Sequence, residues 1–401
     1  MTKLHSKLPC NSSLALNKCL LCLFTALTLF AATVRAAVLP EDRTDVLYHR
    51  YEGGGMMVDG PSVLVRKQVK DTFSFWGNYY VDMISSASID VMTQGSPYTE
   101  QRVETSVGVD YLHDRTTYSL SHTNSNEEDY SADTTSFSLA QEFFGDMTTL
   151  SANYSKGEDE VRKNLRKDGA IVDTFHVGYA SHQRFGVGLT QVLTRKWLVS
   201  LGVESVIDEG FLNNPYRSVR FLQPNGDVGT QSEIYPTTRN SDAVALRTMY
   251  YLPWHASTRL EYRYFTDSWG IRSTNYEIRY IHPIGNQWRV QAKYRAYSQN
   301  AATFYSDLYP YENAQNFLAR DKELSEYTNS GYGLGVTYEI KTHYLAWFDK
   351  TTLNLFWDSI TFNYKTFREN TEENIVQFGA GNEPPYSFNT NVVRFFLTFD
   401  Y

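Results

Sequence analysis

The chain has 401 residues, with 37 Lys and Arg against 45 Asp and Glu, so its net charge is −8. That balance excludes a phosphate-neutralising surface, and no nucleic-acid partner is expected. The mean hydropathy of −0.43 excludes a bundle of membrane-spanning helices, yet Tyr, Phe and Trp make up 15% of the residues. Polarity combined with many aromatic residues is typical of a membrane β-barrel, which meets lipid with one face only.

Residues 1–36 have the pattern of an export signal. Lysines precede an apolar run over residues 19–34, and Val34-Arg35-Ala36 offers small residues for cleavage. A retained helical anchor is the alternative, but the run is short for a bilayer span. The cysteines all lie in this segment, at Cys10, Cys19 and Cys22. After cleavage the chain would therefore have no disulfide, thiolate metal site or cysteine nucleophile.

Residues 37–71 show little clean alternation and are punctuated by glycine. His49 and Arg50 are followed by Gly53, Gly54 and Gly55, and glycine permits backbone conformations and close approaches that other residues do not. The segment is interpreted as a short plug inside a barrel, a periplasmic docking handle or a flexible leader. A hairpin over residues 48–67 is a further alternative.

From residue 72 to 401, apolar residues recur at every second position in segments of about ten residues, the length of a tilted membrane-crossing strand. Short links such as 112–115 and 143–146 alternate with long polar ones such as 85–101, 156–169 and 208–242. We interpret the short links as periplasmic turns and the long ones as external loops. The expected fold is an all-β, antiparallel transmembrane β-barrel of about 14 strands, within a range of about 12–16. A soluble β-sandwich is the structural alternative.

The last residues alternate most clearly. The aromatic and aliphatic positions are Val393, Phe395, Leu397, Phe399 and Tyr401. This pattern resembles the C-terminal strand by which outer-membrane barrels are recognised for assembly. It therefore implies an assembly signal, the barrel-assembly machinery as a partner, and contact with outer-membrane lipid and lipopolysaccharide. An ordinary amphipathic edge strand is the alternative.

The runs at 39–43, 48–55, 59–67 and 78–91 are similar to those of a proteobacterial outer-membrane β-barrel family known only as a domain of unknown function. The resemblance covers essentially all of residues 37–401, with its most specific motifs in the first third. It implies a Gram-negative outer-membrane location and a barrel architecture, and it supplies no activity.

If apolar side chains face lipid, the residues between them face the lumen. Within residues 243–297 these positions are mostly cationic: Arg247, Arg259, Glu261, Arg263, Glu277, Arg279, Arg289, Lys293 and Arg295. In the first half they include Asp82, Glu104 and Asp110, among many small residues. A basic wall facing an acidic one would orient polar solutes and filter ions by charge. Alternatively, Glu261 and Glu277 pair with neighbouring arginines and fill a narrow lumen.

No motif in the sequence predicts catalysis, a cofactor or a metal. His122 and His182 lie toward the outer ends of their strands, the place where a hydrolase site would be built, but sequence alone does not bring them together. The acidic runs 126–129 and 157–160 lack the spacing of a calcium loop. We expect no enzyme. The leading hypotheses are a channel for small polar solutes and a plugged barrel acting as a scaffold for a periplasmic protein or a surface partner, with an outer-membrane hydrolase third.

Overall fold

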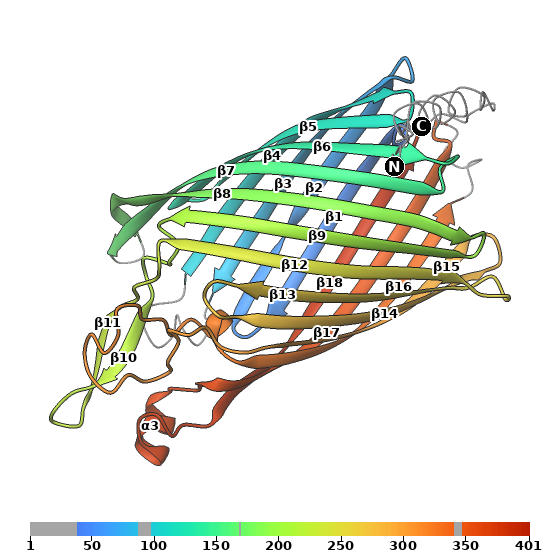
Figure 1. Ribbon diagram of the computed structural model, residues 1–401. Helices are drawn as coiled ribbons and strands as arrows, with labels where there is room; N and C mark the ends of the chain where they lie inside the picture. The colour runs from blue at the N-terminus through green and yellow to red at the C-terminus, as the bar shows by residue number, and fades with distance from the viewer. Residues whose placement is uncertain (1–37, 87–97, 168–169, 341–346) are drawn as a thin grey trace, which may run out of the picture. The chain divides into compact units, whose positions relative to one another are not determined.

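The computed structural model describes residues 38–86, 98–167, 170–340 and 347–401, and within them the chain forms one closed antiparallel barrel of sixteen strands (Figure 1). The barrel strands are β1 Arg43–Gly53, β2 Met56–Val69, β3 Phe73–Ser86, β4 Tyr98–His113, β5 Thr116–Asn126, β6 Tyr130–Phe143, β7 Thr148–Lys167, β8 Ala170–Thr194, β9 Trp197–Gly210, β12 Thr238–Tyr251, β13 Ser257–Asp267, β14 Arg272–Ile284, β15 Trp288–Gln299, β16 Tyr327–Ile340, β17 Lys350–Arg368 and β18 Pro385–Asp400. β1 closes the ring on β18, from Arg43 opposite Asp400 to Gly53 opposite Thr390. Among the described residues, no helix is long and apolar enough to cross a membrane.

The strands alternate between two faces, as the period-two pattern predicts. Large apolar side chains point outward, and Phe75, Val187 and Leu334 are each more than half exposed on this face. Polar and charged residues occupy the lumen side of the same strands. A barrel whose outer belt is apolar and whose interior is polar is the inverse of a soluble sandwich, which buries its apolar face.

The two ends of the barrel differ. Short links join β2 to β3, β4 to β5 and β8 to β9, and both the start of β1 and the end of β18 lie at this end. Long connections follow β9, β15 and β17 at the opposite end, where β10 (Ser218–Leu222), β11 (Val228–Ser232) and the helix α3 (Glu372–Phe378) are found (Figure 1). These long connections are confined to one end, as predicted, although short links also join β1 to β2 and β13 to β14 there.

The strand number corrects the expectation of about 14 strands and a separate N-terminal segment. The additional pair is the hairpin β1–β2, which confirms the hairpin alternative for residues 48–67, so residues 43–69 are not a plug, a docking handle or a flexible leader. Gly54 and Gly55 have φ of 60° and 75° and form the two-residue turn that such a hairpin needs. Gly53 packs against Thr390 so closely that a Cβ would lie 2.3 Å from the Thr390 Cβ. The glycines thus close the barrel seam.

Residues 156–167, expected in an external loop, are strand. They extend β7 along β8, a strand of 25 residues. Polar residues occupy both faces here, with Asp159 buried and Glu158 exposed beside it. Without an apolar face the hydropathy does not alternate, so the strand gives no sequence signal.

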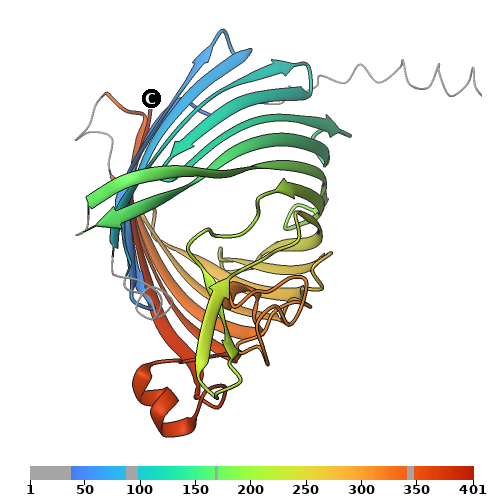
Figure 2. The same ribbon diagram turned by 90° about the vertical axis from the view of Figure 1, so that its left-hand side faces the viewer.

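Three long connections, residues 211–237, 300–326 and 369–384, pack together into what we call the loop cap. Its apolar clusters include Tyr235 and Phe304, which pack on Trp269 of the link between β13 and β14, and Val219 with Tyr309 and Leu318. Figure 2 shows β10, β11 and α3 at this end of the ring. The cap has a buried core of its own, unlike a set of solvated loops.

Candidate functional site

The lumen side of β12–β15 carries a group of cations that we call the basic wall: Arg247, Arg259, Arg263, Arg279, Arg289, Lys293 and Arg295. The register places Arg259 directly opposite Arg279, and Arg279 directly opposite Lys293. These three form the cation row. Like charges at directly opposed positions of a sheet are unfavourable, so packing alone does not explain the row.

Carboxylates compensate the basic wall in part. Glu261 accepts hydrogen bonds from Arg247 at 2.9 Å and from Arg259 at 2.5 Å. Glu277 accepts one from Arg279 at 2.8 Å. Glu261 and Glu277 therefore pair with neighbouring arginines, as the alternative interpretation predicts, while other cations of the wall still face the lumen.

Two further cations of the wall pair with carboxylates on other strands. Lys293 reaches over β16 to Asp358 of β17, with Nζ 2.6 Å from the carboxylate. The position between them is Gly333, where a Cβ would lie 2.8 Å from Lys293 Cε. Arg263 lies 3.1 Å from Glu204 of β9. Only a residue without a side chain allows the contact across β16.

The remaining cations are less compensated. Arg295 donates to the amide oxygen of Asn275 at 2.5 Å, and Arg289 is exposed and has no ion-pair partner among the described residues. The Nε–H groups of Arg259 and Arg279 are buried and donate to no partner within the described part of the chain. The wall therefore keeps a net positive charge.

The predicted acidic residues lie on the lumen side of β3 and β4, but their charge is largely balanced. Asp82 is 4% exposed and lies between His49 at 2.8 Å and Arg102 at 2.5 Å. His49 reaches it across β2 because Gly60 occupies the position between them. The side chain of His49 therefore belongs to the barrel wall, whereas Arg50 points outward and pairs with exposed Glu52.

Asp110 is also buried and paired. It accepts hydrogen bonds from Arg66 and from Ser119, the latter at 2.6 Å. Glu104 lies three lumen rows nearer the loop end than Asp110, opposite Tyr80 of β3. Since the ring order puts β4 across from β14, the basic wall faces a wall whose carboxylates are mostly neutralised.

The wall between these two is lined by small residues. Its lumen positions on β5 to β9 include Ser119, Ser121, Ser136, Ser138, Ser151, Gly186, Gly188, Ser200 and Gly202. Gly202 has open space where a Cβ would be. The lumen is therefore lined by long cationic side chains on one side and by short hydroxyl side chains on another.

The two histidines considered for catalysis lie on different faces. His122 points outward, with Nδ1 3.1 Å from the Thr135 hydroxyl. His182 faces the lumen between Asp208 at 2.7 Å and Asp159 at 2.8 Å, one on each ring nitrogen. A ring held by two carboxylates has no free lone pair to act as a general base.

The two acidic runs, 126–129 and 157–160, differ in what their carboxylates contact. Glu127 and Asp129 come together with Glu100 of β4, their carboxylate oxygens within 4.8 Å of one another. Burial raises the pKa of Glu127, and Asp129 accepts a hydrogen bond from Tyr216 at 2.6 Å. In the run 157–160 each carboxylate has a cationic partner, among them Lys156 on Glu158. The sequence did not indicate Glu100, which is far from the run along the chain.

The predicted assembly strand is β18, the strand that closes the ring. Val393 and Phe395 point outward, each 39% exposed. The Tyr401 backbone N–H donates to the Asp42 carbonyl at 3.1 Å, and Lys67 Nζ lies 4.9 Å from the Tyr401 ring centroid. The end of the chain is therefore fixed to the start of the barrel.

Three solved structures illustrate what the fold is similar to. A bacterial polysaccharide outer membrane secretin is 7% identical with a TM-score of 0.49, covering 90% of this chain and 100% of that one. The siderophore receptor PirA from Acinetobacter baumannii is 12% identical with a TM-score of 0.43, covering 81% of this chain and 53% of the receptor, so the chain spans about half of it. A Pseudomonas aeruginosa FadL homologue is 8% identical with a TM-score of 0.39, covering 90% and 91%.

No curated protein matches the sequence. A family model does, over residues 89–349, which is more than half of the chain. The match includes the whole basic wall and the loop connections after β9 and β15. The chain belongs to the family described as "Protein of unknown function (DUF3570)".

Proposed function

We propose that the protein is an outer-membrane channel for small polar solutes, and that its lumen favours solutes with an anionic group. The membrane placement is supported by the apolar outer belt, the even number of strands, and the division into short and long links. The observation that carries the channel is the basic wall. Its seven cations outnumber the carboxylates that pair with them, so an anion passing along the wall would meet positive charge that the protein does not compensate.

The basic wall also supplies suitable chemistry. Guanidinium groups donate paired hydrogen bonds to carboxylate and phosphate oxygens. Arg289 and Arg295 are free of ion pairs within the described residues, so they are available to a solute. On the strands across the lumen the side chains are short and many carry a hydroxyl group, which suits a water-filled pathway.

Planar-bilayer recording tests the proposal. Arg289→Gln removes one lumen cation without breaking an ion pair, and Arg50→Gln removes one cation from the outer face as a matched control. We expect discrete conductance, with the reversal potential in a salt gradient shifting toward cation preference for Arg289→Gln and not for Arg50→Gln. A barrel that inserts but passes no current would contradict the channel.

The scaffold hypothesis has one observation in its favour, the folded loop cap. Its buried clusters give a defined surface that a partner outside the cell would recognise. The periplasmic docking handle has no counterpart, because residues 43–53 are β1. A barrel that is sealed when intact and conducts after removal of residues 218–232 would favour the plugged scaffold over the channel.

A further inference from the structure

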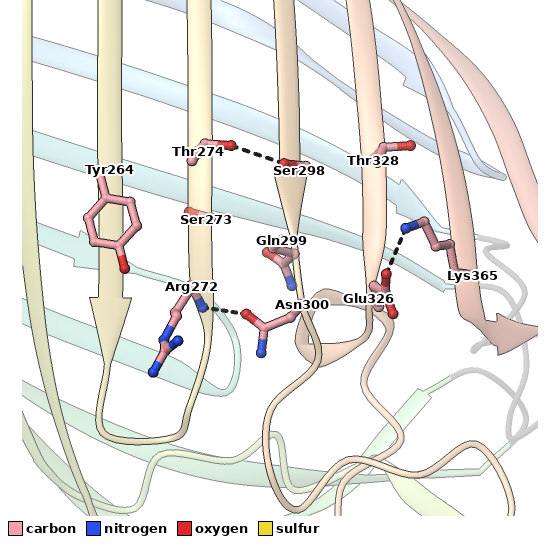
Figure 3. Close-up of a pocket in the computed structure, with 10 residues that line it drawn as sticks. All are labelled: Tyr264, Arg272, Ser273, Thr274, Ser298, Gln299, Asn300, Glu326, Thr328 and Lys365. Carbon is pink, nitrogen blue, oxygen red and sulfur yellow. Dashed lines mark hydrogen bonds and ion pairs between the residues drawn. The ribbon is translucent and has the colours of Figure 1, made fainter.

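A polar pocket lies on the outer wall of the barrel, at the loop ends of β13–β17 (Figure 3). We call it the outer-rim pocket. It has a volume of about 260 Å³, and its lining includes Arg272, Asn300, Glu326 and Lys365 above a row of hydroxyls. None of these residues contributes to the lumen.

The register fixes which way the lining points. Tyr264 is opposite Thr274, Thr274 is opposite Ser298, and Ser298 is opposite Thr328, so these four form one outward row. The Thr274 and Ser298 hydroxyls are 3.0 Å apart. Arg272, Asn300, Glu326 and Lys365 lie on the loop side of that row, as Figure 3 shows.

On the other side of the hydroxyl row the outer face becomes aromatic. Tyr262 and Tyr276 form a pair with ring centroids 4.9 Å apart, and Tyr276 is 56% exposed. The outward chemistry thus changes within three rows from aromatic to hydroxyl to charged. This order is the one that a lipid molecule presents at a membrane surface, from acyl chain to headgroup.

The cations of the pocket are available to a ligand. Lys365 Nζ lies 2.7 Å from Glu326 and its side chain is 59% exposed. Arg272 is exposed, and its guanidinium has no ion-pair partner among the residues described. Its backbone is fixed, because its N–H donates to Asn300 Oδ1 at 2.6 Å. Two cations against one carboxylate leave a net positive pocket.

We propose that the outer-rim pocket binds a phosphate group of an outer-leaflet glycolipid, whose acyl chains lie along Tyr262 and Tyr276. Arg272 and Lys365 hold the phosphate oxygens, and the hydroxyls of Thr274, Ser298 and Thr328 donate to the sugar-phosphate region. The inference shares the proposed membrane placement, and it does not depend on transport through the lumen.

Native mass spectrometry of the detergent-solubilised full chain tests it, with a diphosphorylated lipid A as the probe. We expect the wild type to retain the phosphorylated lipid and to bind its dephosphorylated counterpart weakly. The double variant Arg272→Gln, Lys365→Gln should bind the phosphorylated lipid about thirtyfold more weakly. The matched control Arg50→Gln, Lys156→Gln removes two exposed outward cations from β1 and β7 and should retain it.

Three results would overturn the proposal. One is equal retention by the wild type and the Arg272/Lys365 variant, and another is equal loss in the control, which would indicate attraction to the whole outer face. The third is displacement of the glycolipid by an equal concentration of inorganic phosphate, which would make the site one for free phosphate. If the barrel retains the lipid but passes no current in a bilayer, the channel is contradicted and the glycolipid site is supported.

Discussion

Replacing Glu383 with Gln should loosen the loop cap while leaving the barrel folded. Two buried arginines, Arg220 and Arg320, are 4% and 3% exposed, and two carboxylates, Glu383 and Asp307, balance them. Arg220 Nη2 donates to Glu383 Oε2 at 3.1 Å, and Glu383 is fully buried. Burial opposes its ionisation, but the hydrogen bonds from Arg220 hold the pKa of Glu383 below its usual value.

After the change, Asp307 alone faces both guanidinium groups. Leaving a buried charge without its partner costs about 3–5 kcal/mol. Because the pair lies in the cap, we expect amide exchange in residues 217–222 and 305–320 to accelerate by about a hundredfold or more, as a difference of that size implies. Exchange in the strands of the barrel should not change.

Hydrogen-exchange mass spectrometry at pH 7 is the assay, with Glu312→Gln as an exposed control in the same cap. The double variant Arg220→Met, Glu383→Leu should recover most of the protection, because Asp307 then pairs with Arg320 alone. Cap exchange in Glu383→Gln within a factor of about three of the wild type would show that Glu383 does not hold the cap together, since that factor corresponds to less than about 1 kcal/mol.

Three further changes test other parts of the structure. Gly60→Val should reduce the heat-modifiable, folded fraction on gels, because a Cβ at residue 60 would lie 1.8 Å from the Val81 carbonyl oxygen; Gly202→Val, with open space at its Cβ, should fold, and equal folding of both would contradict the close packing. Burial, with Asp321 nearby, raises the pKa of Glu233 in the cap to about 7, so the stability it contributes is complete below its unfolded value of 4.5 and is lost as the pH rises through 7. Cap exchange corrected for the intrinsic rate should therefore be slower at pH 5.5 than at pH 8, and a Glu233→Gln variant that keeps the same pH dependence would show that another group is responsible. Deleting Tyr401 should lower the amount of barrel recovered from the outer membrane while Tyr401→Phe keeps it, and an undiminished yield from the deletion would count against the assembly role of the last strand.

The barrel itself was predictable because its strands span an apolar and a polar environment. Alternation at Phe73, Phe75 and Tyr79 follows from that difference, and it recurs along most of the chain. The long connections were also predictable, because a polar stretch that interrupts the alternation for many residues marks a loop. The closed antiparallel barrel is confirmed, whereas the assembly signal stays a prediction.

The first hairpin was predicted only as one of several alternatives because its sequence breaks the alternation. Gly60 and Pro61 stand inside β2, where glycine contributes no hydropathy and proline donates no backbone hydrogen bond. The role of Gly60 depends on the pairing of the strands, because it lets His49 of β1 reach Asp82 of β3. A contact that joins three strands through a missing side chain leaves no local pattern.

The site was predictable only in outline. Period-two alternation indicated which charges face the lumen, but pairing depends on register between strands, as with Lys293 and Asp358 across Gly333. The loop cap was seen as polar connections because its small apolar clusters are scattered along three distant segments. Arg220, Asp307 and Glu383 come together only when those segments pack.

The ion selectivity of single channels reports whether the lumen conducts and whether its basic wall favours anions. Purified protein in a planar bilayer with a salt gradient should open discrete conductances that prefer anions, and Arg289→Glu should shift the reversal potential toward cations because it replaces an unpaired lumen cation with a carboxylate. Absence of conductance from correctly inserted barrels, or a reversal potential that is the same in wild type and Arg289→Glu, would contradict the account.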